Sequence, residues 1–124
     1  MDVTIRVDGA ASAVDELLRL RTWIDEDAEL RGRSRMAVAS PEAGELGGLP
    51  EALIVAVAAG VPAALASVVM AWLQRGTSKI TLTIVGAGGT KVELQRVDVR
   101  QIPYAELPGH VEALARALEP PDPD

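Results

Sequence analysis

Apolar and polar residues alternate at the start of the chain. Between Val3 and Val7 every second side chain is apolar, and this period of two predicts a strand with one buried face and one solvated face. Ser12 stands three residues before Asp15, which is the spacing of a capped helix start. Apolar residues follow at helical spacing, so we expect a helix over about residues 13–25.

An uncharged run spans residues 52–73, and its only polar side chain is Ser67. Its side chains recur at spacings of three and four, which is typical of a helix with one bulky face and one flat face, and Pro50 and Glu51 suit a first turn. Pro62 removes a donor and clashes with the carbonyl four residues earlier, so we expect either one kinked helix or two helices. The bulky stripe is Leu53, Val57, Val61, Leu65, Val68 and Trp72, and the small stripe is Ala52, Ala56, Ala59, Ala63 and Ala66.

Three further segments have the composition of strands, and one has that of a helix. Residues 35–39 predict a short strand that ends at Pro41. Residues 79–85 and 90–97 alternate on either side of a glycine-rich turn, so they predict a hairpin. Residues 108–118 predict a last helix, and the acidic, proline-rich residues 119–124 predict a disordered tail.

These elements predict an α+β domain of two layers. Their order is strand, helix, strand, a helix that is single or doubled, strand, strand and helix. Because each predicted strand has one apolar face, we expect a mixed four-stranded sheet with helices packed on one face and a partly polar opposite face. Residues 1–118 form a single domain in this interpretation, since 124 residues suffice for one core.

Composition and charge narrow the classes of function. Acidic side chains outnumber basic ones by 18 to 12, and carboxylates precede the one arginine cluster, so no continuous positive surface is expected for nucleic acid. Aromatic residues make up 2% of the chain, too few for base-stacking platforms. The chain has no cysteine, and its first residues lack the basic head and apolar block of a secretory signal. We expect a cytoplasmic protein.

No arrangement of residues predicts catalysis, a metal or a cofactor. The glycine-rich segment 86–89 precedes a strand, whereas a phosphate-binding loop requires a helix there. His110 is the only imidazole, and its neighbours supply neither a nucleophile nor further ligands. The carboxylates within residues 25–29 lack the spacing of a calcium loop. We therefore expect a protein that is not an enzyme and that carries no cofactor.

The run 52–73 has two interpretations. Its length matches the roughly 20 residues that cross a bilayer, and Ala56 and Gly60 have the small-residue spacing with which helices pack in lipid. Alanine in place of leucine, the break near Pro62 and the amphipathic strands on both sides favour a buried helix that covers those strands. A membrane-associated component that uses residues 52–73 is the alternative.

Several segments of the chain resemble a known family. Residues 40–49 read Ser-Pro-Glu-Ala-Gly-Glu-Leu-Gly-Gly-Leu, and the apolar run that follows ends in Ala-Trp-Leu at residues 71–73 before a strand and a glycine turn. Upstream, a helix with Trp23 leads into Glu-Leu-Arg-Gly-Arg at residues 29–33. In these motifs, which cover roughly residues 14–97, the chain resembles the actinobacterial effector-associated constant components, type one.

The resemblance implies a non-enzymatic component of a bacterial conflict, or defence, system. Such components are encoded beside effectors such as caspase-like or trypsin-like peptidases and beside NTP-dependent regulators, and they are thought to link sensing to effector activation. No catalytic residues belong to the family pattern, so none are transferred. We expect an adaptor that works by protein–protein contact with an effector and that forms a homo-oligomer, because the apolar run offers more surface than four strands cover. A small enzyme or ligand-binding domain is a third hypothesis, for which no convergent polar residues are visible.

Candidate contact residues fall into three groups. The first is a turn, for which a plain helix entry is the favoured interpretation. The second is part of the small-residue stripe, and the third is the polar face of the predicted sheet. They are Gly44, Glu45 and Leu46; Ala56, Ala59, Gly60 and Ala63; and Arg6, Thr81 and Thr83.

Overall fold

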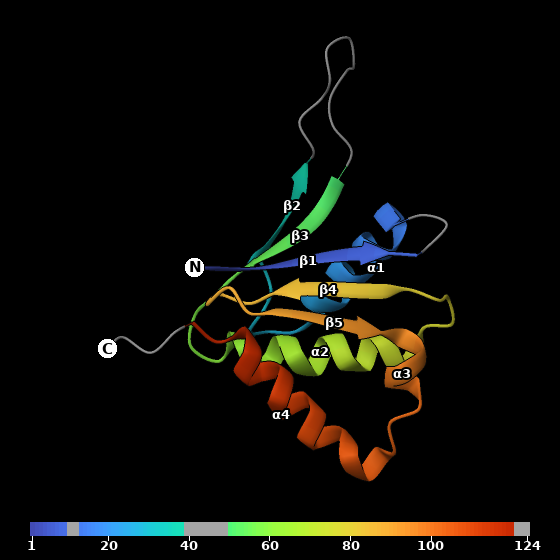
Figure 1. The fold of residues 1–124 in the computed structure, drawn as a ribbon. Coiled ribbons are helices and arrows are strands. Elements are labelled where there is room, and N and C mark those ends of the chain that lie inside the picture. Colours follow the sequence, from blue (N-terminus) through green and yellow to red (C-terminus); the bar gives the residue numbers. More distant parts are fainter. Residues whose placement is uncertain (10–12, 39–49, 121–124) are drawn as a thin grey trace.

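The computed structural model describes residues 1–9, 13–38 and 50–120 (Figure 1). Within these ranges the chain forms five strands, four α-helices and one short 3₁₀ helix. In chain order they are β1 (Asp2–Asp8), α1 (Ala13–Glu26), β2 (Ser34–Val38), β3 (Pro50–Ala56), α2 (Val61–Arg75), β4 (Thr81–Val85), β5 (Lys91–Gln95), α3 (Arg96–Arg100), the 3₁₀ helix η1 (Tyr104–Glu106) and α4 (Leu107–Leu118).

The sheet has five strands in the order β2-β3-β1-β4-β5, and every neighbouring pair is antiparallel. The α+β class is confirmed. The predicted count of four strands and the mixed pairing are wrong, because β3 inserts between β2 and β1. β2 and β1 run in the same direction, but each pairs with the oppositely directed β3 instead of with the other.

The first five residues of the uncharged run belong to strand β3, which corrects the prediction of a helix that begins near Pro50. Leu53 pairs with Ile5 of β1 on one side and with Met36 of β2 on the other. β3 therefore lies inside the sheet, and its Leu53 and Val55 side chains are fully buried. Over seven residues, apolar side chains fit a buried strand as well as a buried helix, so the pattern alone could not separate them.

The expected break near Pro62 is complete. Gly60 has φ 86°, a left-handed conformation that favours glycine, and it occupies the N-cap position of α2. Pro62 lies in the first turn of α2, where its missing N–H breaks no helical hydrogen bond. The run is thus one strand followed by one helix, rather than one kinked helix or two helices.

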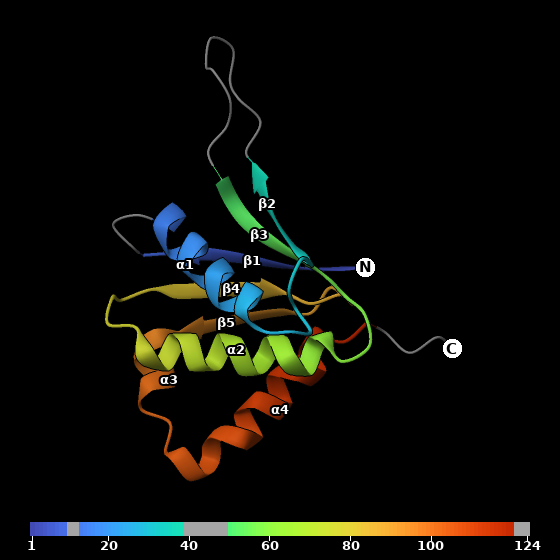
Figure 2. The ribbon, with the colours of Figure 1, turned by 180° about the vertical axis from the view of Figure 1, so that it is seen from behind.

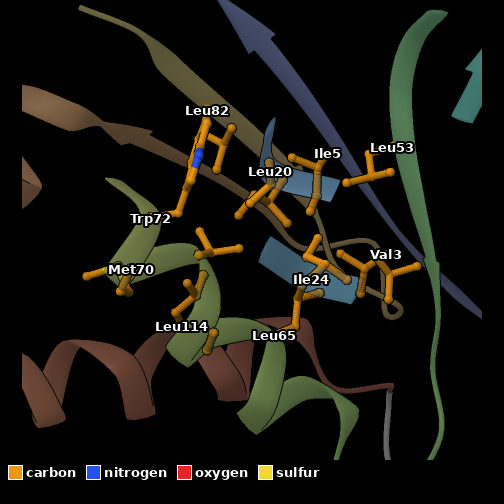
Figure 3. Packing of buried hydrophobic residues seen from close by; sticks show 14 of the residues in the cluster. Val3, Ile5, Leu20, Ile24, Leu53, Leu65, Met70, Trp72, Leu82 and Leu114 are labelled. Carbon is orange, nitrogen blue, oxygen red and sulfur yellow. The ribbon is translucent and has the colours of Figure 1, made fainter. Parts of the chain in front are cut away.

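The helices α1 and α2 lie on one face of the sheet, as the comparison of Figures 1 and 2 shows. α1 crosses β1 and its neighbours, and α4 packs beside α2 past the β5 edge. Figure 3 shows Leu65 and Trp72 of α2 directed toward the buried side chains of the strands. Both residues are buried, and Val57 packs partly buried against the same core, so the inward orientation expected for these side chains is confirmed.

The remaining elements follow the sequence pattern closely. The first strand, the helix over about residues 13–25, the glycine-turn hairpin and the last helix are confirmed with shifts of a few residues. Helix α3 and η1 were not predicted. Val97 belongs to α3, whereas the alternating pattern predicted it as the last residue of a strand.

Candidate interaction surfaces

The sheet face opposite α1 and α2 carries no helix among the described residues (Figure 1). We call it the open sheet face. Its members come from alternate positions of all five strands, which project to the same side because directly paired residues of antiparallel strands share a face. They are Asp2, Thr4, Arg6, Asp8, Arg35, Ala37, Ala52, Ile54, Ala56, Thr81, Thr83, Val85, Lys91, Glu93 and Gln95.

The centre of the open sheet face is uncharged. Thr4 pairs with Ile54 on one side and with Val85 on the other, and all three side chains are half-buried. Charged residues lie at the two ends of this row, where Arg35 pairs with Ile54 and Lys91 pairs with Val85. A weakly polar centre with a charged rim is an arrangement that protein interfaces use.

The structure brings together the three residues expected on the polar face. Arg6 and Thr83 are directly paired across β1 and β4, and Thr81 pairs with Asp8 in the same ladder. Glu93 lies beyond Thr83 on β5, so a cation and a carboxylate flank the threonine. The shared face is confirmed, and a role in binding stays a prediction.

The small residues expected to form one stripe on a helix are divided between a strand, a connection and a helix. Ala56 ends β3 opposite Asp2, Ala59 and Gly60 lie in the connection to α2, and Ala63 lies on α2. They separate because the run divides into a strand and a helix at Gly60. The turn residues Gly44, Glu45 and Leu46 lie outside the described residues.

Ala63 instead lines a hollow between α2 and α4, which we call the α2–α4 groove. Its volume is about 590 Å³, and its walls are mostly apolar. Tyr104 stands at this groove with 90% of its surface exposed. The other walls come from Ser67, Ala71, Leu107, Val111 and Ala115.

A buried polar network lies at the C-terminal end of α2, and no sequence pattern indicated it. Arg96 is 2% exposed; its Nε donates to the Leu73 carbonyl at 3.0 Å, and its Nη1 donates to Ser78 Oγ at 2.7 Å. Ser78 Oγ in turn donates to Glu16 Oε1 at 3.0 Å, and Glu16 Oε2 lies 3.9 Å from Arg96 Nη1. The guanidinium also stacks on Trp72 at 4.5 Å from the ring centroid. The network thus joins α1, α2, α3 and the α2–β4 connection.

Burial is the largest influence on the pKa of the Arg96 guanidinium. Removal from water lowers the pKa of the Arg96 guanidinium below its usual value, and the nearby Glu16 carboxylate acts in the opposite direction. An arginine so placed is still a cation at neutral pH. Since its donors are directed at groups of the same chain, the network is best explained as a structural brace.

Neither a metal site nor a membrane-spanning helix is found within the described ranges 1–9, 13–38 and 50–120. No group of three or more His, Asp or Glu side chains there is placed to hold a metal ion. No helix there has both the length and the apolar character needed to cross a bilayer.

Comparison with known proteins identifies the family. Neither the curated proteins nor the solved structures give a match to the chain. One family model does match, and it covers residues 8–119 of the 124, from the end of β1 to the residue after α4. The chain therefore belongs to the family described as Effector Associated Constant Component 1.

Proposed function

We propose that this chain is a non-enzymatic adaptor of a bacterial conflict system, which couples sensing to an associated effector by protein–protein contact in the cytoplasm. The effector in this proposal is a peptidase of the caspase-like or trypsin-like kind. The family name supports association with an effector. The adaptor mechanism, the kind of effector and self-association are the proposed parts.

The open sheet face is the observation that carries the proposal. A half-buried row of Thr4, Ile54 and Val85 faces away from the core, and no described helix covers it. A partner that covers this row gains apolar burial without disturbing the fold of the adaptor. The charged residues around the row set the orientation and the identity of the partner.

A charge placed in the centre of this face tests the proposal. The chain and the effector encoded beside it are purified, and their binding is measured by calorimetry. We expect Val85→Lys to weaken binding by about tenfold or more, because the ammonium would be desolvated without a partner. Leu18→Lys is the matched control, since Leu18 is exposed on α1, which lies on the opposite face of the sheet (Figure 1). Absence of binding by the unsubstituted chain, or equal loss with both variants, contradicts the proposal.

Self-association has its own measurement. The chain carries a net charge of −6, so copies repel one another at low salt, and an apolar contact such as the α2–α4 groove must supply the attraction. We expect light scattering at high protein concentration and moderate salt to give a mass above 13.0 kDa. A monomer throughout the concentration range contradicts this part of the proposal.

A further inference from the structure

Strand β5 is the last strand of the sheet, and its hydrogen-bonding pattern shows which backbone groups face outward. The Arg96 N–H donates to the Ile80 carbonyl at 3.1 Å, and the Gly86 N–H donates to the Thr90 carbonyl at 2.8 Å. In an antiparallel ladder such bonded pairs alternate with non-bonded pairs. The backbone of Glu93 therefore points away from β4, toward the edge where no described strand pairs with it.

A hollow of about 430 Å³ lies along this edge, between β5 and α4, and we call it the β5–α4 groove. At one end α4 closes on the hairpin turn. There the Ala87 N–H donates to the Leu118 carbonyl at 3.2 Å, and Gly86 lies so close to the Ala117 carbonyl that a Cβ would overlap it. From this end α4 diverges from β5 toward α3, as both ribbon views show (Figures 1 and 2). Apolar side chains line the groove, namely Met70, Val92, Leu94, Val99, Ile102 and Leu114.

Carboxylates outnumber cations along the β5–α4 groove and the β5 edge. Glu93 and Asp98 are among its lining residues, and His110 is the other titratable group there. The Glu93 side chain lies on the open sheet face, where Lys91 Nζ is 3.7 Å from its Oε1, and this exposed ion pair is weak enough for a partner's cation to replace. An adjoining hollow, which shares His110, adds Glu106. With a net charge of −6 over the chain, this edge favours a partner segment that carries cations.

We propose that the β5 edge binds an extended, basic segment of a partner protein as an additional strand of the sheet. The segment alternates apolar side chains with lysine or arginine. Its main chain exchanges hydrogen bonds with Glu93, its apolar side chains enter the β5–α4 groove and its cations meet Glu93 and Asp98. This inference rests on the proposed function, since it names the kind of partner segment and a second surface on which that segment docks.

Defined peptides test the proposal directly. The probe is a fluorescein-labelled peptide of alternating lysine and valine, six residues long, and fluorescence polarisation measures its affinity for the full chain. We expect saturable binding, and binding weaker by about tenfold or more when glutamate replaces lysine in the probe. We expect a similar loss when the backbone nitrogens of the lysines are methylated, because in an antiparallel added strand the residues opposite Glu93 share its face and carry the donors that pair with the edge. Absence of saturable binding, or equal affinity for the methylated probe, overturns the proposal.

Two substitutions of Glu93 separate the contribution of its backbone N–H from that of its side chain. Glu93→Pro removes the outward N–H but leaves the ladder to β4 intact, and proline is tolerated on edge strands in this setting. Glu93→Ala removes the same side chain and keeps the N–H. We expect the proline variant to bind the lysine–valine probe about tenfold more weakly than the alanine variant, with unchanged circular dichroism. Equal affinities of the two variants overturn the proposal, and the methylated probe provides the same test if the proline variant fails to fold.

The outcomes separate this inference from the proposed function. If the effector binds the unsubstituted chain and the Glu93→Pro variant equally well, the edge-strand inference is wrong and the proposed function stands. If the lysine–valine probe binds as expected but the effector does not bind at all, the proposed function is wrong, and the β5 edge remains a site for basic extended segments.

Discussion

Replacement of Arg96 by alanine is expected to lower the free energy of unfolding by about 2–4 kcal/mol. The change removes the donors that satisfy the Leu73 carbonyl and Ser78 Oγ, and it takes away one of the two cations near the Glu16 carboxylate, which keeps Arg19 at 3.1 Å. The buried Leu73 carbonyl, which loses its donor, is the costly part, because its desolvation is no longer offset by a hydrogen bond. Against the roughly 5–15 kcal/mol typical of a domain, this loss is large.

Urea denaturation followed by tryptophan fluorescence measures the effect, and Trp72 beneath the guanidinium reports the change locally. Arg100→Ala is the matched control, because Arg100 is exposed on the same short helix, and it should change stability by no more than about 0.5 kcal/mol. Arg96→Lys should recover only part of the loss, since an ammonium lacks the planar fork that reaches Leu73 and Ser78 together. Equal stabilities of the Arg96→Ala and Arg100→Ala variants would show that the network contributes nothing.

Local alternation and turn chemistry sufficed to predict much of the fold. β1 and β4 each have one buried face and one more exposed face, and β5 alternates between half-buried and exposed side chains. This is the case in which a period of two is most informative. The edge strand β2 was also predicted, although its observed bounds lie one residue earlier in the chain at each end. The order of the strands was not predictable in this way, because it depends on where β3 inserts and not on any local pattern.

The strand β3 was missed for a physical reason. It lies between β1 and β2, and its inner residues Leu53 and Val55 as well as the outward Ala52 are buried, so it lacks the polar positions that mark an amphipathic strand. The helical pattern of α2 continued backward into it without a polar interruption. Gly60 followed by Val61 and Pro62 was the signal that separates the two elements, since a left-handed glycine before a first-turn proline is a helix start.

The candidate surfaces were predictable only in part. Alternation placed Arg6, Thr81 and Thr83 on one face, and the register confirms that they share it. The link between Glu16 and Ser78 spans 62 positions of the chain, so no local pattern could indicate it. The β5–α4 groove depends on the angle between two elements, which only the packed structure defines.

Replacement of Leu65 by alanine is the second change with a large expected effect. Leu65 lies in the middle of α2, has no exposed surface and points into the core that Figure 3 shows. Loss of its buried methyl groups leaves a cavity between α2 and the strands, so we expect the free energy of unfolding to fall by about 2–5 kcal/mol. Urea denaturation in detergent-free buffer provides the measurement.

The same helix offers a control that separates core packing from helix propensity. Ser67→Ala changes an exposed position two residues away, and it should change stability by no more than about 0.5 kcal/mol, with alanine the better helix former. If α2 served to contact lipid rather than its own strands, Leu65→Ala would cost little in water. Equal stabilities of the Leu65→Ala and Ser67→Ala variants would therefore contradict the buried role of α2 and would favour a membrane-associated interpretation of the apolar run.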